Sequence, residues 1–136
     1  MSIIKWRDSY NTGVAHFDRE HHKIIELIER MYVALRNELD KETVEEVCRE
    51  AISYTEVHLA NEERAMIAIH YPGLEEQKTE HLRMKKEVEK FQELIEANYK
   101  EGATGLYHFL RDWLINHILV CDKKYGPYFP DGVSFE

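Results

Sequence analysis

Apolar residues recur three and four positions apart through four long segments of this chain, and short breaks separate the segments. This spacing lines up apolar side chains along one face of each segment, which is the pattern of an amphipathic helix. We predict helices over about 18–37, from 40 or 43 to about 70, over 74–99 and over about 104–122. Four helices on short connections bury their apolar faces most simply as an antiparallel up-down-up-down four-helix bundle. The sequence therefore predicts an all-α fold.

Local signals mark the ends of these helices. Asp18 is the expected N-cap of the first helix, and Thr43-Val44-Glu45-Glu46 fits a capping box for a second helix that begins near Asp40 or Thr43. Tyr71-Pro72-Gly73 should end that helix, because proline cannot continue it. The glycines at 102 and 105 interrupt the pattern and place the start of the fourth helix near Thr104.

Size and charge restrict the class of protein further. The 136 residues fit one domain, 1–136, with an N-terminal arm before the first helix and a short C-terminal tail over 125–130. The net charge of −8 disfavours nucleic acid and anionic membrane surfaces as partners. No stretch approaches the roughly 18 apolar residues of a membrane span. Cys48 and Cys121 form no CxxC motif, which suits a reducing, cytoplasmic location and a monomer or weak oligomer without disulfides.

Each apolar stripe contains polar residues that a dry core would exclude. They are His21 in the first helix, His58 and Glu62 in the second, Gln77 and His81 in the third, and His117 in the fourth. An unpaired buried imidazole or amide costs about 1–3 kcal/mol, and a buried carboxylate costs more. A folding free energy of about 5–15 kcal/mol cannot absorb all of these costs. A metal centre compensates them together, because its ligands are ionised carboxylates and neutral imidazoles.

The spacing of the polar residues agrees with convergence on one point. His58 and Glu62, like Gln77 and His81, are four residues apart, which is about 40° around a helix. A single pair of this kind is more often a surface pair, and a lone core histidine is usually satisfied by the protein. Six such groups at matching heights favour a metal site. Mixed imidazole and carboxylate ligands suit iron, or less specifically manganese or zinc, and their number favours two ions over one.

The fourth helix leaves two candidates for a further ligand. Asp122 is five residues beyond His117, an offset of about 140° on a regular helix, so it faces inward only if the helix loosens into a π-type turn or ends there. Cys121 lies four residues beyond His117, and spacing alone favours it. The remaining histidines are expected outside the site: His22 and His108 in solvent, His16 in the arm, and His70 at a helix boundary. Cys48 is expected to be a small core residue.

These motifs together resemble the hemerythrin family, and most closely its single-domain bacterial members, over nearly the whole chain. The resemblance is carried by Trp6, Tyr10–Val14, Phe17–His21, His58-x-x-x-Glu62, Tyr71-Pro72, Gln77-x-x-x-His81, and Asp112–His117 followed by Asp122-Lys123. It implies that Asp122, and not Cys121, is the ligand from the end of the fourth helix.

The resemblance also implies a non-haem di-iron centre that cycles between Fe2+ and Fe3+ with an oxo or hydroxo bridge. One iron would be held by His81, His117 and the residue at position 77. The other would be held by His21 and His58, and Glu62 and Asp122 would bridge both.

By the same resemblance, O2 binds the His21/His58 iron as a hydroperoxide hydrogen-bonded to the bridge. Trp113 and Leu114 would then form apolar walls of the O2 pocket that exclude water and extra protons. The implied function is oxygen storage, delivery or sensing, and not enzymatic catalysis.

Position 77 departs from the family, which carries histidine there. Gln77 could ligate through its carbonyl oxygen, hydrogen-bond a water that ligates, or leave a vacancy. A vacancy favours autoxidation or peroxide chemistry, so a di-iron redox enzyme with peroxidase-like or NO-handling activity is the second hypothesis. A metal-free helical bundle that acts as an interaction module is the third.

Overall fold

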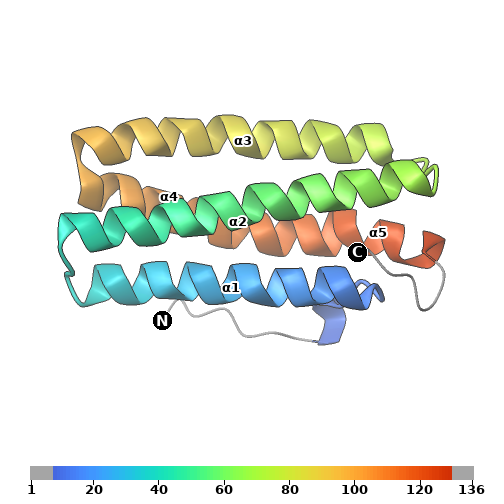
Figure 1. Cartoon of the computed structure of the whole chain (residues 1–136), viewed down its shortest axis with the longest axis horizontal. Helices are drawn as coiled ribbons and strands as arrows, with labels where there is room; N and C mark the ends of the chain where they lie inside the picture. Colours follow the sequence, from blue (N-terminus) through green and yellow to red (C-terminus); the bar gives the residue numbers. More distant parts are fainter. Residues whose placement is uncertain (1–7, 130–136) are drawn as a thin grey trace.

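The computed structural model describes residues 8–129, and within this range it contains helices and no strand. The four long helices are α1 (Ala15–Arg36), α2 (Lys41–Ala68), α3 (Leu74–Ala97) and α4 (Tyr99–His117). Short segments follow and precede them: η1 (Asp8–Tyr10), the π-helical η2 (Ile118–Asp122), α5 (Lys123–Tyr125) and η3 (Gly126–Tyr128). Consecutive long helices run antiparallel, and α4 returns beside α1 to close the bundle (Figure 1). The predicted antiparallel four-helix bundle is confirmed. Trp6 lies outside the described residues.

The observed starts of α1 and α2 show which of the predicted capping residues act as caps. The α2 cap is Asp40, whose Oδ1 accepts from the Thr43 backbone N–H at 2.9 Å, so the alternative start at Thr43 is wrong. Asp18 is not the cap of α1, because that helix already begins at Ala15. Its Oδ1 instead accepts from the backbone N–H and the hydroxyl of Thr12, at 2.8 and 2.9 Å. Asp18 thus ties the arm to the first turn of α1.

The fourth helix begins at Tyr99, five residues before the predicted start, and contains both Gly102 and Gly105. Asn98 is the cap, and its Oδ1 accepts from the Glu101 backbone N–H at 3.3 Å. A Cβ at Gly102 would collide with the backbone of Ile95 at the end of α3. Gly102 therefore permits a close approach of α3 and α4 and does not break the helix. The predicted start near Thr104 was wrong because it treated this glycine as a helix breaker.

The apolar side chains form two clusters. The larger one lies along the middle of all four helices, and it includes the buried thiol of Cys48, as predicted. The smaller one, around Phe17 and Tyr125, gathers residues from α1, the end of α2 and the tail. Between these two clusters lies a layer of buried polar side chains.

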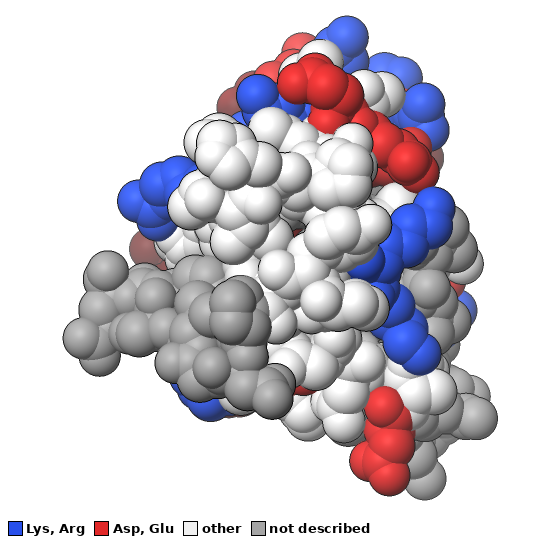
Figure 2. All heavy atoms as spheres, turned by 90° about the vertical axis from the view of Figure 1, so that its right-hand side faces the viewer, with Lys and Arg blue, Asp and Glu red and all other residues white. Residues whose placement is uncertain are grey.

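The end of the bundle beyond the smaller cluster is poor in charge. Figure 2 shows this end with uncharged residues across its centre and Lys, Arg, Asp and Glu mainly near its edges. Tyr71 and Tyr128 make an edge-to-face contact here, with ring centroids 5.0 Å apart. Among residues 8–129, none of the helices combines the length and the apolar character that crossing a bilayer requires.

Candidate metal centre

The polar layer brings together all seven side chains that the sequence singled out as candidate ligands. Each is at most 3% exposed. The donors come from five elements, with His21 on α1, His58 and Glu62 on α2, Gln77 and His81 on α3, His117 on α4, and Asp122 on η2. Residues distant in the sequence therefore converge because each sits on the inward face of its own element.

Two overlapping groups of donor atoms occur in this layer. His21, His58, Glu62 and Asp122 form the first, and His81 and His117 share Glu62 in the second. Within each group one donor atom per residue lies within 4.8 Å of the others.

Glu62 lies between both groups. Its Oε1 is 3.2 Å from His58 Nε2 and 3.7 Å from His81 Nε2.

Asp122 also has one oxygen toward each side. Its Oδ2 is 3.0 Å from His21 Nε2, and its Oδ1 is 2.9 Å from His117 Nε2. These two carboxylates are thus positioned between the two pairs of imidazoles.

The inward position of Asp122 depends on a local change of helix type. After His117 the chain continues as the π-helix η2, whose wider turn brings the residue at i+5 onto the face of His117. Asp122 is fully buried in the polar layer, while Cys121 is 8% exposed and belongs to neither donor group. The preference for Cys121 from regular helical spacing is wrong, because the helix is not regular at that point.

Two residues that sequence reasoning missed hold the donors in orientation. Glu20 Oε1 lies 2.8 Å from His58 Nδ1, and Asn61 Nδ2 donates to Glu20 Oε2 at 2.9 Å. The Tyr125 hydroxyl donates to Glu62 Oε2 at 2.6 Å. Glu20 had a sequence signal, because it falls between Phe17 and Ile24 on the same apolar stripe. Tyr125 had none.

The electrostatics of the layer favour ionised acids. Burial alone would raise the pKa of Glu62, but the nearby charges of His58 and His21 hold that pKa well below its ordinary value. Burial would likewise lower the pKa of His58, but Glu62 and Glu20 raise it to about 10. In His81, burial prevails and, with the charge of His117, lowers the pKa. The site therefore offers carboxylates that attract cations.

Hydrogen bonding within the protein does not satisfy this layer. Among the described residues, the buried side-chain nitrogen and oxygen atoms that lack a hydrogen bond are His21 Nδ1 and Nε2, His58 Nε2, Glu62 Oε1, Gln77 Oε1, His81 Nδ1, His117 Nδ1 and Asp122 Oδ2. Each such atom costs about 1–3 kcal/mol when it stays unpaired. Imidazole nitrogens and carboxylate oxygens without thiolate are donors for iron and related cations. The residues present therefore fit a pair of metal ions.

Comparison with known proteins agrees with this donor set. Residues 12–129 match the family described as Hemerythrin HHE cation binding domain. This chain belongs to the hemerythrin family. It is 31% identical over 126 residues to the bacteriohemerythrin of Stenotrophomonas maltophilia, covering 93% of this chain and 81% of that protein. It is also 31% identical over 128 residues to the bacteriohemerythrin of Clostridium acetobutylicum, covering 90% and 98% of the two chains.

Gln77 is the one candidate ligand that is neither a histidine nor a carboxylate. Its Nε2 donates to Asp122 Oδ1 at 3.3 Å, while its Oε1 is buried without a hydrogen bond. This orientation is chemically consistent, because an amide oxygen turned toward the carboxylate would repel it. The amide thus supports Asp122 and keeps a carbonyl oxygen free.

The two predicted wall residues occupy different surroundings. Leu114 is 1% exposed and packs in the larger apolar cluster. Trp113 is half-buried and stacks on the His117 ring, with centroids 4.5 Å apart and planes at 13°. Leu114 therefore keeps the adjoining interior dry, and Trp113 covers one face of a candidate ligand.

The remaining histidines lie away from the two donor groups. His22 and His108 are exposed, as predicted. His70 follows the end of α2 with a φ of 55°, which confirms its position at a boundary. His16 is in the first turn of α1 and not in the arm, and its Nε2 lies 3.5 Å from Glu20 Oε2.

Proposed function

We propose that this protein binds O2 reversibly at a di-iron centre in its buried polar layer. The observation that carries the proposal is the pair of donor groups that share Glu62, with one Asp122 oxygen within 3.0 Å of an imidazole nitrogen on each side. Family membership supports it, and so do the relatives named bacteriohemerythrin.

We assign His21 and His58 to one iron, and His81 and His117 to the other. Glu62 and Asp122 are proposed to bridge the two ions, because each carboxylate approaches imidazoles of both pairs. Gln77 is proposed to stand near the His81/His117 iron, where its free Oε1 is an available weak donor.

A pair of bound iron ions would supply the two electrons that O2 takes up on binding and gives back on release. We place O2 on the His21/His58 side, because the proposed ligand set there lacks a third side chain. Glu20 holds the His58 ring in orientation by its bond to Nδ1, and Tyr125 holds Glu62. Leu114 excludes water, which protects the site against irreversible oxidation.

A second candidate function is a di-iron redox enzyme with peroxidase-like or NO-handling activity. Gln77 is the specific observation in its favour, because a neutral amide is a weaker ligand than imidazole. An open second position would let small oxidants reach both ions.

The absorption spectrum of the protein loaded anaerobically with ferrous iron tests these alternatives. A charge-transfer band that appears with O2 and disappears on deoxygenation, through repeated cycles, is expected for an O2-binding protein. Rapid conversion to a stable oxidised form with turnover of added peroxide would favour the enzyme. Fewer than one bound iron per chain would favour the metal-free interaction module.

We also propose a reducing location such as the cytoplasm. Cys48 and Cys121 are both buried and neither forms a disulfide bond, and free thiols persist in reducing compartments.

A further inference from the structure

A groove lies between α1 and α4 at the end of the bundle remote from the polar layer. It consists of two adjoining hollows of about 100 and about 350 Å³, which share Leu35 and Thr104 in their walls. Arg36 in its wall is fifteen residues beyond His21 on the same helix, which corresponds to about 22 Å along the axis. The groove is therefore separate from the candidate metal centre.

The larger hollow has an aromatic wall. The rings of Tyr32 on α1 and Tyr107 on α4 lie 5.6 Å apart with planes at 38°, and the Tyr107 and His108 rings lie 5.1 Å apart. Aromatic side chains bind flat rings by offset stacking and edge contacts. A hollow of this size is at the small end of the range for ligand sites, so it suits a ligand of one or two rings.

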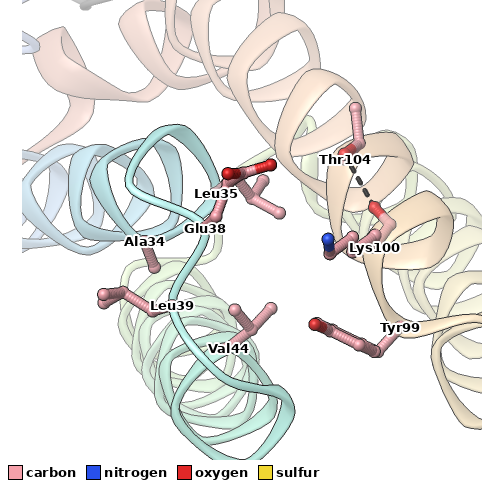
Figure 3. A pocket seen from close by; sticks show the side chains of 8 residues that line it. All are labelled: Ala34, Leu35, Glu38, Leu39, Val44, Tyr99, Lys100 and Thr104. Carbon is pink, nitrogen blue, oxygen red and sulfur yellow. Dashed lines mark hydrogen bonds between the residues drawn. The ribbon is translucent and has the colours of Figure 1, made fainter.

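The smaller hollow extends the groove toward α2. Figure 3 shows Tyr99 reaching from α4 toward Val44, with Glu38 and Leu35 on the side of α1. Apolar side chains and a tyrosine thus continue the wall of the larger hollow.

The charged residues of the groove favour an anion. Arg36 borders the larger hollow and Lys100 the smaller one, while Glu38 is the one acid that lines either. Neither Arg36 nor Lys100 forms an ion pair with another of residues 8–129, so both cations are available. On a chain with a net charge of −8, this excess of positive charge beside an aromatic wall is a local exception.

We propose that this groove binds a small aromatic anion, such as an aromatic carboxylate, with its ring against Tyr32 and His108 and its charge toward Arg36. The ligand would contact both α1 and α4. Because it binds the folded state only, it would also raise the melting temperature of the protein. The proposal is independent of the O2-binding function.

Titration with 1-naphthoate and with its neutral amide, 1-naphthamide, tests both parts of the proposal. Isothermal titration calorimetry on the intact protein should show one naphthoate per chain, bound at least fivefold more tightly than naphthamide. Equal affinities would overturn the assignment to an anion. Absence of saturable naphthoate binding up to millimolar concentration would overturn the site itself.

Variants that remove a positive or a negative charge from the groove should change naphthoate affinity in opposite directions. Arg36→Gln should weaken naphthoate binding about fivefold and leave naphthamide unchanged, because it removes a cation from the wall. Glu38→Gln should tighten naphthoate binding two- to threefold. Arg49→Gln, which removes an exposed arginine from α2 outside the groove, is the matched control and should change neither. Equal effects of Arg36→Gln and Arg49→Gln would contradict a local site.

Thr104→Trp tests the location by filling the position that both hollows share. Thr104 is exposed on α4, so the helix should tolerate the larger side chain. Naphthoate binding should fall more than tenfold, while helicity, iron content and the O2-dependent spectrum stay unchanged. Undiminished naphthoate binding would place the ligand elsewhere and overturn the proposal. If Thr104→Trp does not fold, the Arg36 and Glu38 variants test the location of the site instead.

Discussion

The apolar middle of the bundle and the polar layer beside it are equally buried but differ in what holds them together. Ile24 is 1% exposed and His21, one turn earlier on the same helix, is 0% exposed. The apolar side chains need only each other, and each contributes about 1.5–3 kcal/mol by leaving water. The polar layer contains all the buried side-chain atoms that lack hydrogen bonds among the described residues. The apolar middle therefore stabilises the fold, and the polar layer offers donor groups that could hold cations.

The largest effect is expected from Glu62→Ala, because this carboxylate belongs to both donor groups. Iron content should fall from two ions per chain to one or none. The loss in thermal stability of the iron-loaded protein should exceed that from Glu56→Ala, an exposed site on the same helix. Iron analysis and thermal melts check both. Retention of two ions would mean that Glu62 does not bridge.

Leu106→Ala tests the other region of this comparison, because it should destabilise the apolar middle without changing the metal ligands. Leu106 is 0% exposed in the larger apolar cluster, and truncation of such a residue costs about 2–5 kcal/mol. Urea unfolding of the metal-free protein should show this loss, while the folded variant still binds two irons. Leu82→Ala is the control, because Leu82 is 55% exposed. A decrease in the free energy of unfolding of less than about 1 kcal/mol would contradict the role assigned to the apolar middle.

A smaller effect is expected from Glu20→Ala, which removes the partner of His58 Nδ1. Loss of such an outer partner typically weakens metal affinity about 10–100-fold. Competition with a ferrous chelator measures the change. Glu20→Gln should restore part of the affinity, because its carbonyl oxygen still accepts from Nδ1–H. An unchanged affinity in Glu20→Ala, as expected for the exposed control Glu26→Ala, would show that Glu20 does not position His58.

The smallest effect is expected from Gln77→His, which places an imidazole where the sequence resemblance leads us to expect one. Ferrous affinity should rise severalfold, and autoxidation of the O2-loaded protein should become slower. Chelator competition and the decay of the O2-dependent band measure these quantities. Gln92→His, on the exposed face of the same helix, is the matched control. If both quantities match those of the control, Gln77 lies outside the ligand set.

The sequence predicted the architecture because helical periodicity alone determines which face of each helix is buried. It predicted the candidate site because His21, His58 and His117 stand in apolar stripes. The start of α4 could not be predicted, since the close approach at Gly102 exists only once α3 and α4 are packed. Residue spacing left open whether Asp122 on a π-turn or Cys121 on a regular helix faces inward, because spacing does not reveal the local helix type.

Other parts of the molecule depend on contacts between distant segments. Tyr125 meets Glu62 only because the tail folds over the end of the bundle. The groove likewise requires Tyr32 and Tyr107 to be neighbours on α1 and α4, and helical periodicity does not specify which residues of two helices meet.

Anaerobic titration of the metal-free protein with ferrous iron, followed by the melting temperature, tests the central claim most directly. If a pair of cations neutralises the buried donors, the melting temperature should rise with added iron and reach a plateau at two ions per chain. A melting temperature that does not respond, or a plateau below one ion per chain, would contradict the account.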